Sequence, residues 1–244
     1  MPHKKLLIYM IFSILSIGNI HAESIYLMQM NQAQWDKSQF NETIDLLKES
    51  KPVELSSPLK VSPFHHQIEV NTEVKRDFCI SCHTALPHAK SERLRSYLNM
   101  HVNHLACTSC HFRPEGIKLD YRKHEWVNVQ PEKTGSKRFL VTPFSEQGIE
   151  AFDSEQPAIA ELLRDWKENS IEQRARLHLQ IHTPLKNEGL GCHDCHSAEQ
   201  SKLDFAQLGY ERDEIKSITN NPIARFLGDE SFKDKPIKLI DLLQ

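Results

Sequence analysis

The cysteines of this chain lie in three short motifs of one pattern, Cys-x-x-Cys-His, and the motifs use all six of them. The motif residues are Cys79, Cys82 and His83, then Cys107, Cys110 and His111, then Cys192, Cys195 and His196. This spacing is the attachment pattern of c-type haem, in which two thiols add to the porphyrin vinyl groups and the adjacent histidine ligates the iron. The sequence therefore predicts three covalently bound haem c groups.

Two other uses of paired cysteines fit this spacing less well. A structural zinc site needs four ligands, and three pairs that are each followed by histidine do not divide into such sites. A thioredoxin-like redox pair lies within a βαβ pattern, and no alternation of strands and helices surrounds these motifs. Plain disulfides, which the oxidising compartment of an exported protein favours, also explain this spacing less well than haem attachment does.

The N-terminus predicts export. A Lys-Lys pair precedes an apolar run from Leu6 to Ile20, and Ala22 offers a small residue for cleavage, so that residues 1–22 match a secretory signal peptide. The run of 15 residues is shorter than the ~20 residues that span a bilayer. We expect an exported, periplasmic protein that contacts a membrane only if this segment stays uncleaved.

The N-terminus, the three motifs and the surplus of histidine resemble the multihaem c-type cytochromes of bacterial periplasms, here with three haems. The resemblance implies a mainly α fold with much irregular structure, few or no strands, and haem groups that form the core. It also implies that many irons take a second, distal histidine. Methionine is the alternative distal ligand, but the chain has 14 histidines against 5 methionines.

Nine histidines remain when the three motif ligands and the two histidines of residues 1–22 are set aside, and they are the candidates for distal ligands: His65, His66, His88, His101, His104, His124, His178, His182 and His193. His101 is the leading candidate, because it shares the apolar face of a predicted helix with Leu94 and Leu98 and a histidine there needs a partner. We expect it to ligate the first haem, since little chain separates it from Cys107. His104 is a second candidate, and a satisfied core or surface histidine is the alternative for both.

A second cluster of candidates consists of His178 and His182, which lie four residues apart on one face of a predicted helix. Ser170 and Gln173 match a capping box at its start, and Pro184 ends it, because a residue before proline avoids the helical region. We expect at least one of the two histidines to be a distal ligand.

The remaining histidines are assigned more weakly. Small class III cytochromes place a distal histidine upstream of their first motif, near a phenylalanine, and the resemblance carries this role to His66, or to its neighbour His65. We expect exposure rather than ligation for His88 and His124, and we expect His193 to point away from its own iron.

Apolar patterning and the proline and glycine positions divide the chain into six segments. They are the signal peptide 1–22, an N-terminal segment and linker 23–63, a di-haem module 64–126, an irregular loop 127–155, a helical segment with the third haem 156–200, and a C-terminal tail 201–244 with one helix. The loop is predicted because proline and glycine interrupt its polar sequence.

Composition excludes several functional classes. The net charge of −3 leaves no basic footprint for nucleic acid, and a mean hydropathy of −0.52 excludes a protein with many membrane spans. Because iron with two strong axial ligands has no open position, we expect an electron carrier that serves redox partner proteins. The alternatives are a multihaem reductase with one open haem site and a haem subunit of a larger redox complex.

Overall fold

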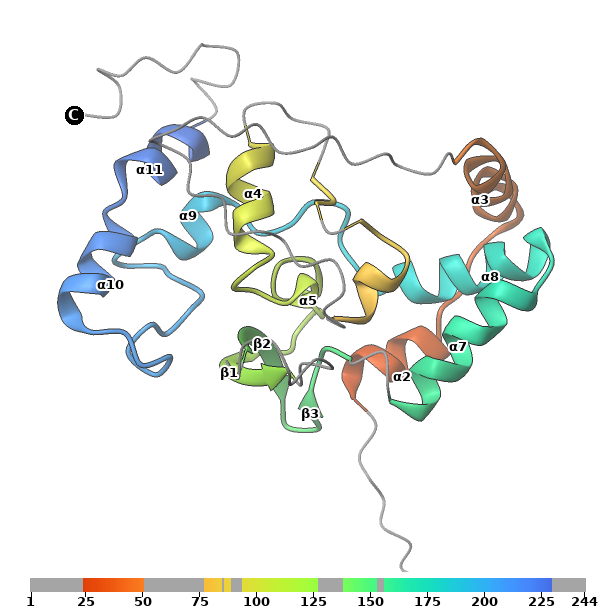
Figure 1. Ribbon diagram of the computed structural model, residues 1–244, viewed down its shortest axis with the longest axis horizontal. Coiled ribbons are helices and arrows are strands. Elements are labelled where there is room, and N and C mark those ends of the chain that lie inside the picture. The colour runs from red at the N-terminus through yellow and green to blue at the C-terminus, as the bar shows by residue number, and fades with distance from the viewer. Residues whose placement is uncertain are drawn as a thin grey trace, which may run out of the picture.

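Helices dominate the structure, as the sequence predicts, and one small sheet accompanies them (Figure 1). The computed structural model describes residues 24–50, 77–84, 86–88, 94–126, 138–152 and 156–229. The predicted signal peptide and the candidates His65 and His66 lie outside the described residues. Among the described helices, none is long and apolar enough to cross a membrane.

Four helices gather at one end of the molecule, at the right of Figure 1. They are α2 (Ile25–Asn31), α3 (Lys37–Glu49), α7 (Pro157–Glu168) and α8 (Ile171–His182). Helix α8 begins with the predicted capping box, in which the Ser170 and Gln173 side chains each accept a backbone N–H, and it ends at His182, as predicted. Helices α2, α3 and α7 all pack against α8.

The apolar cluster at this end is built around Tyr26, which is only 1% exposed. Its ring meets Phe112 edge-on at 5.2 Å between ring centroids and stacks on Phe152 at 5.4 Å. Its hydroxyl donates to the carbonyl of Ile181 in α8 at 2.9 Å. Because Phe112 directly follows the second motif, helix α2 supports the region that carries that motif.

The sheet consists of β1 (Asp120–Trp126), β2 (Arg138–Ser145) and β3 (Gly148–Ile149), paired antiparallel in the order β1-β2-β3. The prediction of an irregular loop over 127–155 is therefore wrong for β2 and β3. Proline and glycine suggested a loop, but Leu140 and Thr142 are buried in the middle of β2. Gly148 instead serves the turn between the two strands, where its φ of 121° suits glycine.

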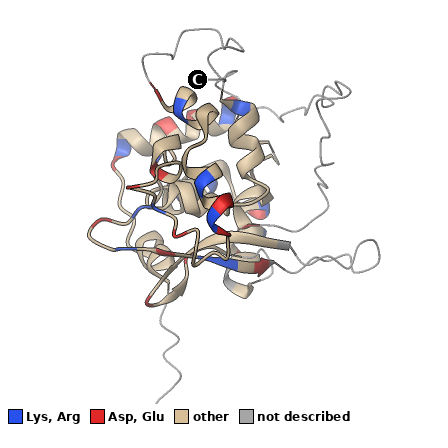
Figure 2. Cartoon of the chain, turned by 90° about the vertical axis from the view of Figure 1, so that its left-hand side faces the viewer, with Lys and Arg blue, Asp and Glu red and all other residues tan. Residues whose placement is uncertain are grey.

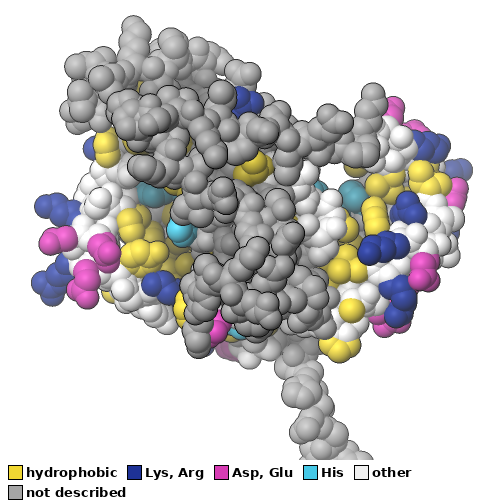
Figure 3. Space-filling view, in the orientation of Figure 1, with side chains coloured by type: hydrophobic (Ala, Val, Ile, Leu, Met, Phe, Trp, Pro, Cys, Tyr) yellow, Lys and Arg dark blue, Asp and Glu magenta, His cyan; other side chains and the backbone are white. Residues whose placement is uncertain are grey.

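The C-terminal segment also forms more structure than the single helix that the sequence predicts. It contains α10 (Arg212–Thr219) and α11 (Pro222–Gly228), which lie with α9 (Cys192–Cys195) at the end opposite α2 (Figure 1). A second apolar cluster joins this segment to the sheet, and it includes Leu203, Phe205 and Leu208 with Tyr121 and Val141. Basic and acidic residues are interspersed along the described chain (Figure 2), and their side chains are mixed on the face that Figure 3 shows.

A buried carboxylate ties α2 to the sheet. Glu150 has no exposed surface, and it accepts the backbone N–H groups of Ile25 and Tyr26 at 3.2 and 2.9 Å. The hydroxyl of Ser145 also donates to it. These bonds satisfy amide groups in the first turn of α2, which have no partner within the helix.

Replacing Glu150 with Ala is expected to lower the free energy of unfolding by about 2 to 3 kcal/mol, because two buried N–H groups lose a charged acceptor. Urea unfolding followed by far-UV circular dichroism measures the change. The matched control is Glu146→Ala, since Glu146 is exposed in the adjoining turn and a substitution there should stay within about 0.5 kcal/mol of the wild type. Equal stability of the two variants would contradict this role.

Candidate functional site

Each of the three motifs forms a single short helical turn. The first lies on the 3-10 helix η1 (Phe78–Ser81), the second on α5 (Cys107–His111) and the third on α9. The N–H of His83 donates to the carbonyl of Cys79 at 2.9 Å, and the N–H of His196 donates to the carbonyl of Cys192 at 2.8 Å. Residues three and four apart share one side of such a turn, so each motif presents its two thiols and its histidine together. All six cysteines lie in the described residues, and none of them is paired in a disulfide.

The imidazole rings of the motif histidines each face the ring of one histidine from elsewhere in the chain. His83 faces His182 with 6.0 Å between ring centroids, His196 faces His101 at 6.0 Å, and His111 faces His88 at 6.4 Å. Two imidazoles that ligate one metal from opposite sides, each at a metal–nitrogen distance of about 2 Å, have ring centroids about 6 Å apart. The three pairs therefore fit one iron each.

Hydrogen bonds to backbone carbonyls hold four of these six rings and place the proton of each on Nδ1. The Nδ1 atoms of His101 and His182 lie 2.7 Å from the carbonyls of Tyr97 and His178, one turn earlier in their own helices. The Nδ1 atoms of the motif residues are held by distant segments, His111 by the Lys186 carbonyl at 2.9 Å and His196 by the Ile218 carbonyl at 2.8 Å. A carbonyl only accepts, so Nδ1 carries the proton and Nε2 keeps the lone pair for a metal.

A side-chain amide holds His88 in the same way. The Asn99 Oδ1 atom lies 3.2 Å from Nδ1 of His88 and accepts its backbone N–H at 3.1 Å, while Asn99 Nδ2 donates to the His88 carbonyl at 3.2 Å. Asn99 lies on α4 (Arg95–His101), the helix that also carries His101. One short helix thus positions two of the three partner histidines.

Burial favours the neutral form of these imidazoles. Partial burial is the leading cause that lowers the pKa of His88, His101 and His182 below the usual range. Neutral imidazole is the form that ligates a metal.

The structure brings some of the predicted candidates together and leaves others apart. His101 faces the third motif at His196, whereas the sequence reasoning expected it near the first. His88, for which we expected exposure, is half-buried and faces His111. His104 is exposed, and its ring pairs with no motif histidine among the described residues. Sequence periodicity does not identify His88 as a ligand candidate. The residue that holds its ring, Asn99, is 11 positions away and becomes a neighbour only in the folded chain.

Of the two histidines on α8, only His182 faces a motif. The His178 ring stacks on His182 at 4.0 Å between centroids, and burial, then the nearby His182 and His83, lower its pKa to about 4. His193 is exposed inside its own motif. His124 lies on β1 and meets the ring of Phe144 at 6.1 Å.

The first and second motifs meet at a buried carboxylate. Asp77 is 3% exposed and precedes η1 directly. Its Oδ1 accepts the N–H of Cys79 at 3.3 Å, and its Oδ2 accepts the N–H of Cys107 at 2.8 Å. Burial is the leading cause that raises the pKa of this carboxyl group above its usual range.

The second motif contacts the segment 185–189, which ends three residues before Cys192, the first residue of the third motif. The N–H of Lys186 donates to the carbonyl of His111 at 2.8 Å, and Arg113 donates through its guanidinium to the carbonyls of Glu188 and Gly189. The buried Tyr121 belongs to an apolar cluster against which Cys195 of the third motif packs, and burial is the leading cause that raises the pKa of its hydroxyl to about 12. The second motif is thus linked to both of the others through these intervening residues.

Sequence reasoning missed the C-terminal segment as part of this arrangement. Ile218 in α10 supplies the carbonyl that orients His196, and α11 packs against α9. A Cβ atom added at Gly228 would lie 2.9 Å from the ring of His193. The predicted tail therefore positions the third motif, and no local pattern in residues 201–244 indicates that role.

Comparison with known proteins identifies one family over part of the chain. A family model described as cytochrome c554 and c-prime matches residues 21–112, which contain the first two motifs. No curated protein and no solved structure matches the chain. Together with the motifs, the family match supports a c-type cytochrome that binds haem c covalently and transfers electrons.

Proposed function

We propose that this chain is a periplasmic tri-haem cytochrome that carries electrons between redox partner proteins. In this proposal one motif histidine and one distal histidine would hold each iron, in the pairs His83–His182, His111–His88 and His196–His101. The single observation that carries the proposal is that the three motif histidines each face a different second histidine at the spacing of two ligands of one metal.

The paired histidines favour a carrier over a reductase. A haem iron with two imidazole ligands supplies one-electron exchange and leaves no coordination position for a substrate. A reductase would leave one motif histidine without a second histidine across from it, and each of the three motif histidines has one. Electron exchange without substrate binding is therefore the function that this arrangement supports best.

The protein's own contribution is to fix ligands and exclude water. The carbonyls of Tyr97 and His178 hold the distal rings of His101 and His182 in place, and such outer hydrogen bonds raise the basicity of a ligand. A more basic imidazole stabilises the ferric state, so these residues favour low potentials within the range that ligation allows. The rings of His88, His101 and His182 are half-buried, which limits reorganisation of water around them when the charge changes.

The contacts between the motifs support a linear arrangement of the haems. Asp77 joins the first motif to the second, and the Lys186 and Arg113 contacts join the second to the segment before the third. The proposed order is first, second, third, with the haem of Cys107 and Cys110 in the middle. Export rests on the signal-like pattern of residues 1–22 and on the oxidising compartment in which c-type cytochromes typically work.

Haem stoichiometry tests the proposal. We expect a pyridine haemochrome content of three haems per chain, a covalent haem stain on denaturing gels, and six-coordinate low-spin ferric signals in low-temperature EPR. The control is a Cys107→Ala, Cys110→Ala variant, which should retain two haems because it lacks one pair of attachment thiols. Fewer than three haems in the wild type, or a resting high-spin haem that binds carbon monoxide or nitrite, would refute the tri-haem carrier.

A further inference from the structure

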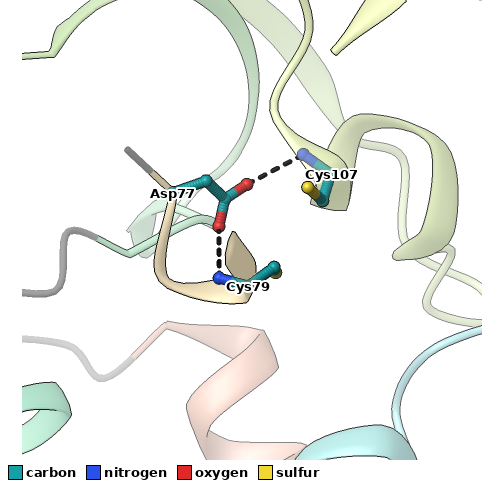
Figure 4. A group of neighbouring side chains, drawn as sticks. All are labelled: Asp77, Cys79 and Cys107. Atoms are coloured by element: carbon teal, nitrogen blue, oxygen red, sulfur yellow. Dashed lines mark hydrogen bonds between the residues drawn. The ribbon is translucent and has the colours of Figure 1, made fainter. Parts of the chain in front are cut away.

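Asp77 is the one described side chain that hydrogen-bonds two of the motifs at once. Figure 4 shows its two carboxylate oxygens directed to the backbone N–H groups of Cys79 and Cys107, which begin the first and second motifs. The Sγ atoms of the two cysteines and an oxygen of Asp77 all lie within 4.8 Å of one another. The attachment points of two haem groups therefore meet at this carboxylate.

A buried carboxyl group without hydrogen-bond partners would destabilise the fold at this position. Asp77 is 3% exposed, and a carboxyl group loses its hydration there unless hydrogen bonds replace the water. Both oxygens have such partners, and both partners belong to haem-attachment turns. The residue also caps η1, and the N–H of the next residue, Phe78, donates to the carbonyl of Phe152 at 2.8 Å, which ties the same turn to the apolar cluster around Tyr26.

The geometry suits aspartate better than its closest analogues. Asparagine keeps one acceptor oxygen, but its NH2 group would face the second backbone N–H, and two donors do not bond. A neutral aliphatic residue would leave both N–H groups unsatisfied. Only a carboxylate of this length accepts from both motifs at the observed distances of 3.3 and 2.8 Å.

We propose that Asp77 is a positioning residue that fixes the first two haem-attachment turns against each other and thereby sets the interaction between the first and second haems. This inference rests on the proposed tri-haem function. It adds that the position of the first haem relative to the second depends on the Asp77 side chain, whereas the position of the third haem does not.

The test compares three variants of the full haem-containing protein: Asp77→Asn, Asp77→Ala and the control Glu150→Gln. Glu150 is the matched control because it is also a buried carboxylate that accepts two backbone N–H groups, but those groups belong to α2 and to no motif. Spectropotentiometric titration resolves the Nernst components, and EPR of the oxidised protein reports interaction between neighbouring ferric haems.

We expect both Asp77 variants to retain three covalent haems. Two of the three Nernst components should shift and the third should keep its potential, with a larger shift for Ala than for Asn because Ala releases both turns. The EPR interaction between the first two haems should weaken in the same order. Glu150→Gln should lower stability without moving any potential, which separates positioning from a general loss of structure.

Other outcomes contradict the inference. If the wild type carries three haems but the Asp77 variants move none of the potentials, or move all three equally, Asp77 does not position the first two haems. If Glu150→Gln moves the same two components, the effect is one of overall stability. A wild type with fewer than three haems would instead refute the proposed function, so the two failures are distinguishable.

Discussion

The His101→Ala variant should convert one of three low-spin ferric haems to a high-spin form and raise its potential, while all three haems remain covalently attached. His101 faces His196 at 6.0 Å between ring centroids, and Ala leaves the iron of the third motif with one imidazole. The potential rises because loss of a donor ligand destabilises the ferric state, within the ~0.8 V range that axial ligands set. Low-temperature EPR and the pyridine haemochrome content measure the two parts of this result.

Two controls define which histidine and which haem are involved. His104→Ala should leave the low-spin spectrum unchanged, because His104 is exposed. It is a matched control because it removes the same side chain only three residues from His101. In a Cys192→Ala, Cys195→Ala background, which lacks the third haem, His101→Ala should change nothing further. If it still converts one of the two remaining haems, His101 ligates the first or second iron, and the pairing with His196 is wrong.

Corresponding variants of the other distal histidines extend the test. His182→Ala should affect the haem of the first motif and His88→Ala that of the second. His178→Ala should keep all three haems low-spin, because its ring stacks on His182 and does not face a motif histidine. Conversion of a haem in the His178 variant would show that the two histidines of α8 exchange roles.

The largest expected effect on stability comes from Tyr26→Ala, which should lower the free energy of unfolding by about 3 to 5 kcal/mol. The ring is 1% exposed and contacts both Phe112 and Phe152, so its removal leaves a cavity next to the second motif. Tyr26→Phe should cost only about 1 kcal/mol, since it removes the single hydrogen bond to the Ile181 carbonyl.

Urea unfolding measured by circular dichroism distinguishes these variants, because covalent haem stays on the unfolded chain and the haem content does not change. The control is Met28→Ala on the same helix, where the side chain is 39% exposed and the cost should stay within about 0.5 kcal/mol. A Tyr26→Ala protein as stable as the Met28 variant would show that the segment before the first motif is not part of the core.

Helix boundaries were predictable where local chemistry sets them. The capping box of Ser170 and Gln173 and the stop before Pro184 depend on residues within a few positions of each other, and both predictions are confirmed. The β2 strand was not predictable in the same way. Its Leu140 and Thr142 become buried only through pairing with β1 and packing of the C-terminal segment, and these contacts are distant in sequence.

The sequence by itself determined the chemistry of attachment. A Cys-x-x-Cys-His turn contains both thiols and one histidine within five residues, so the prediction needs no knowledge of the rest of the fold. The family match over residues 21–112 supports the same cofactor class.

Only the tertiary structure decided which second histidine faces each motif. All the spare imidazoles offer the same donor atoms, and nothing local distinguishes His88 from His104 or His182 from His178. The choice depends on where α4 and α8 lie relative to motifs far away in the chain, and on carbonyls such as that of Ile218 that orient the rings. These contacts form between distant segments, and so the sequence limited the candidates while the fold selected among them.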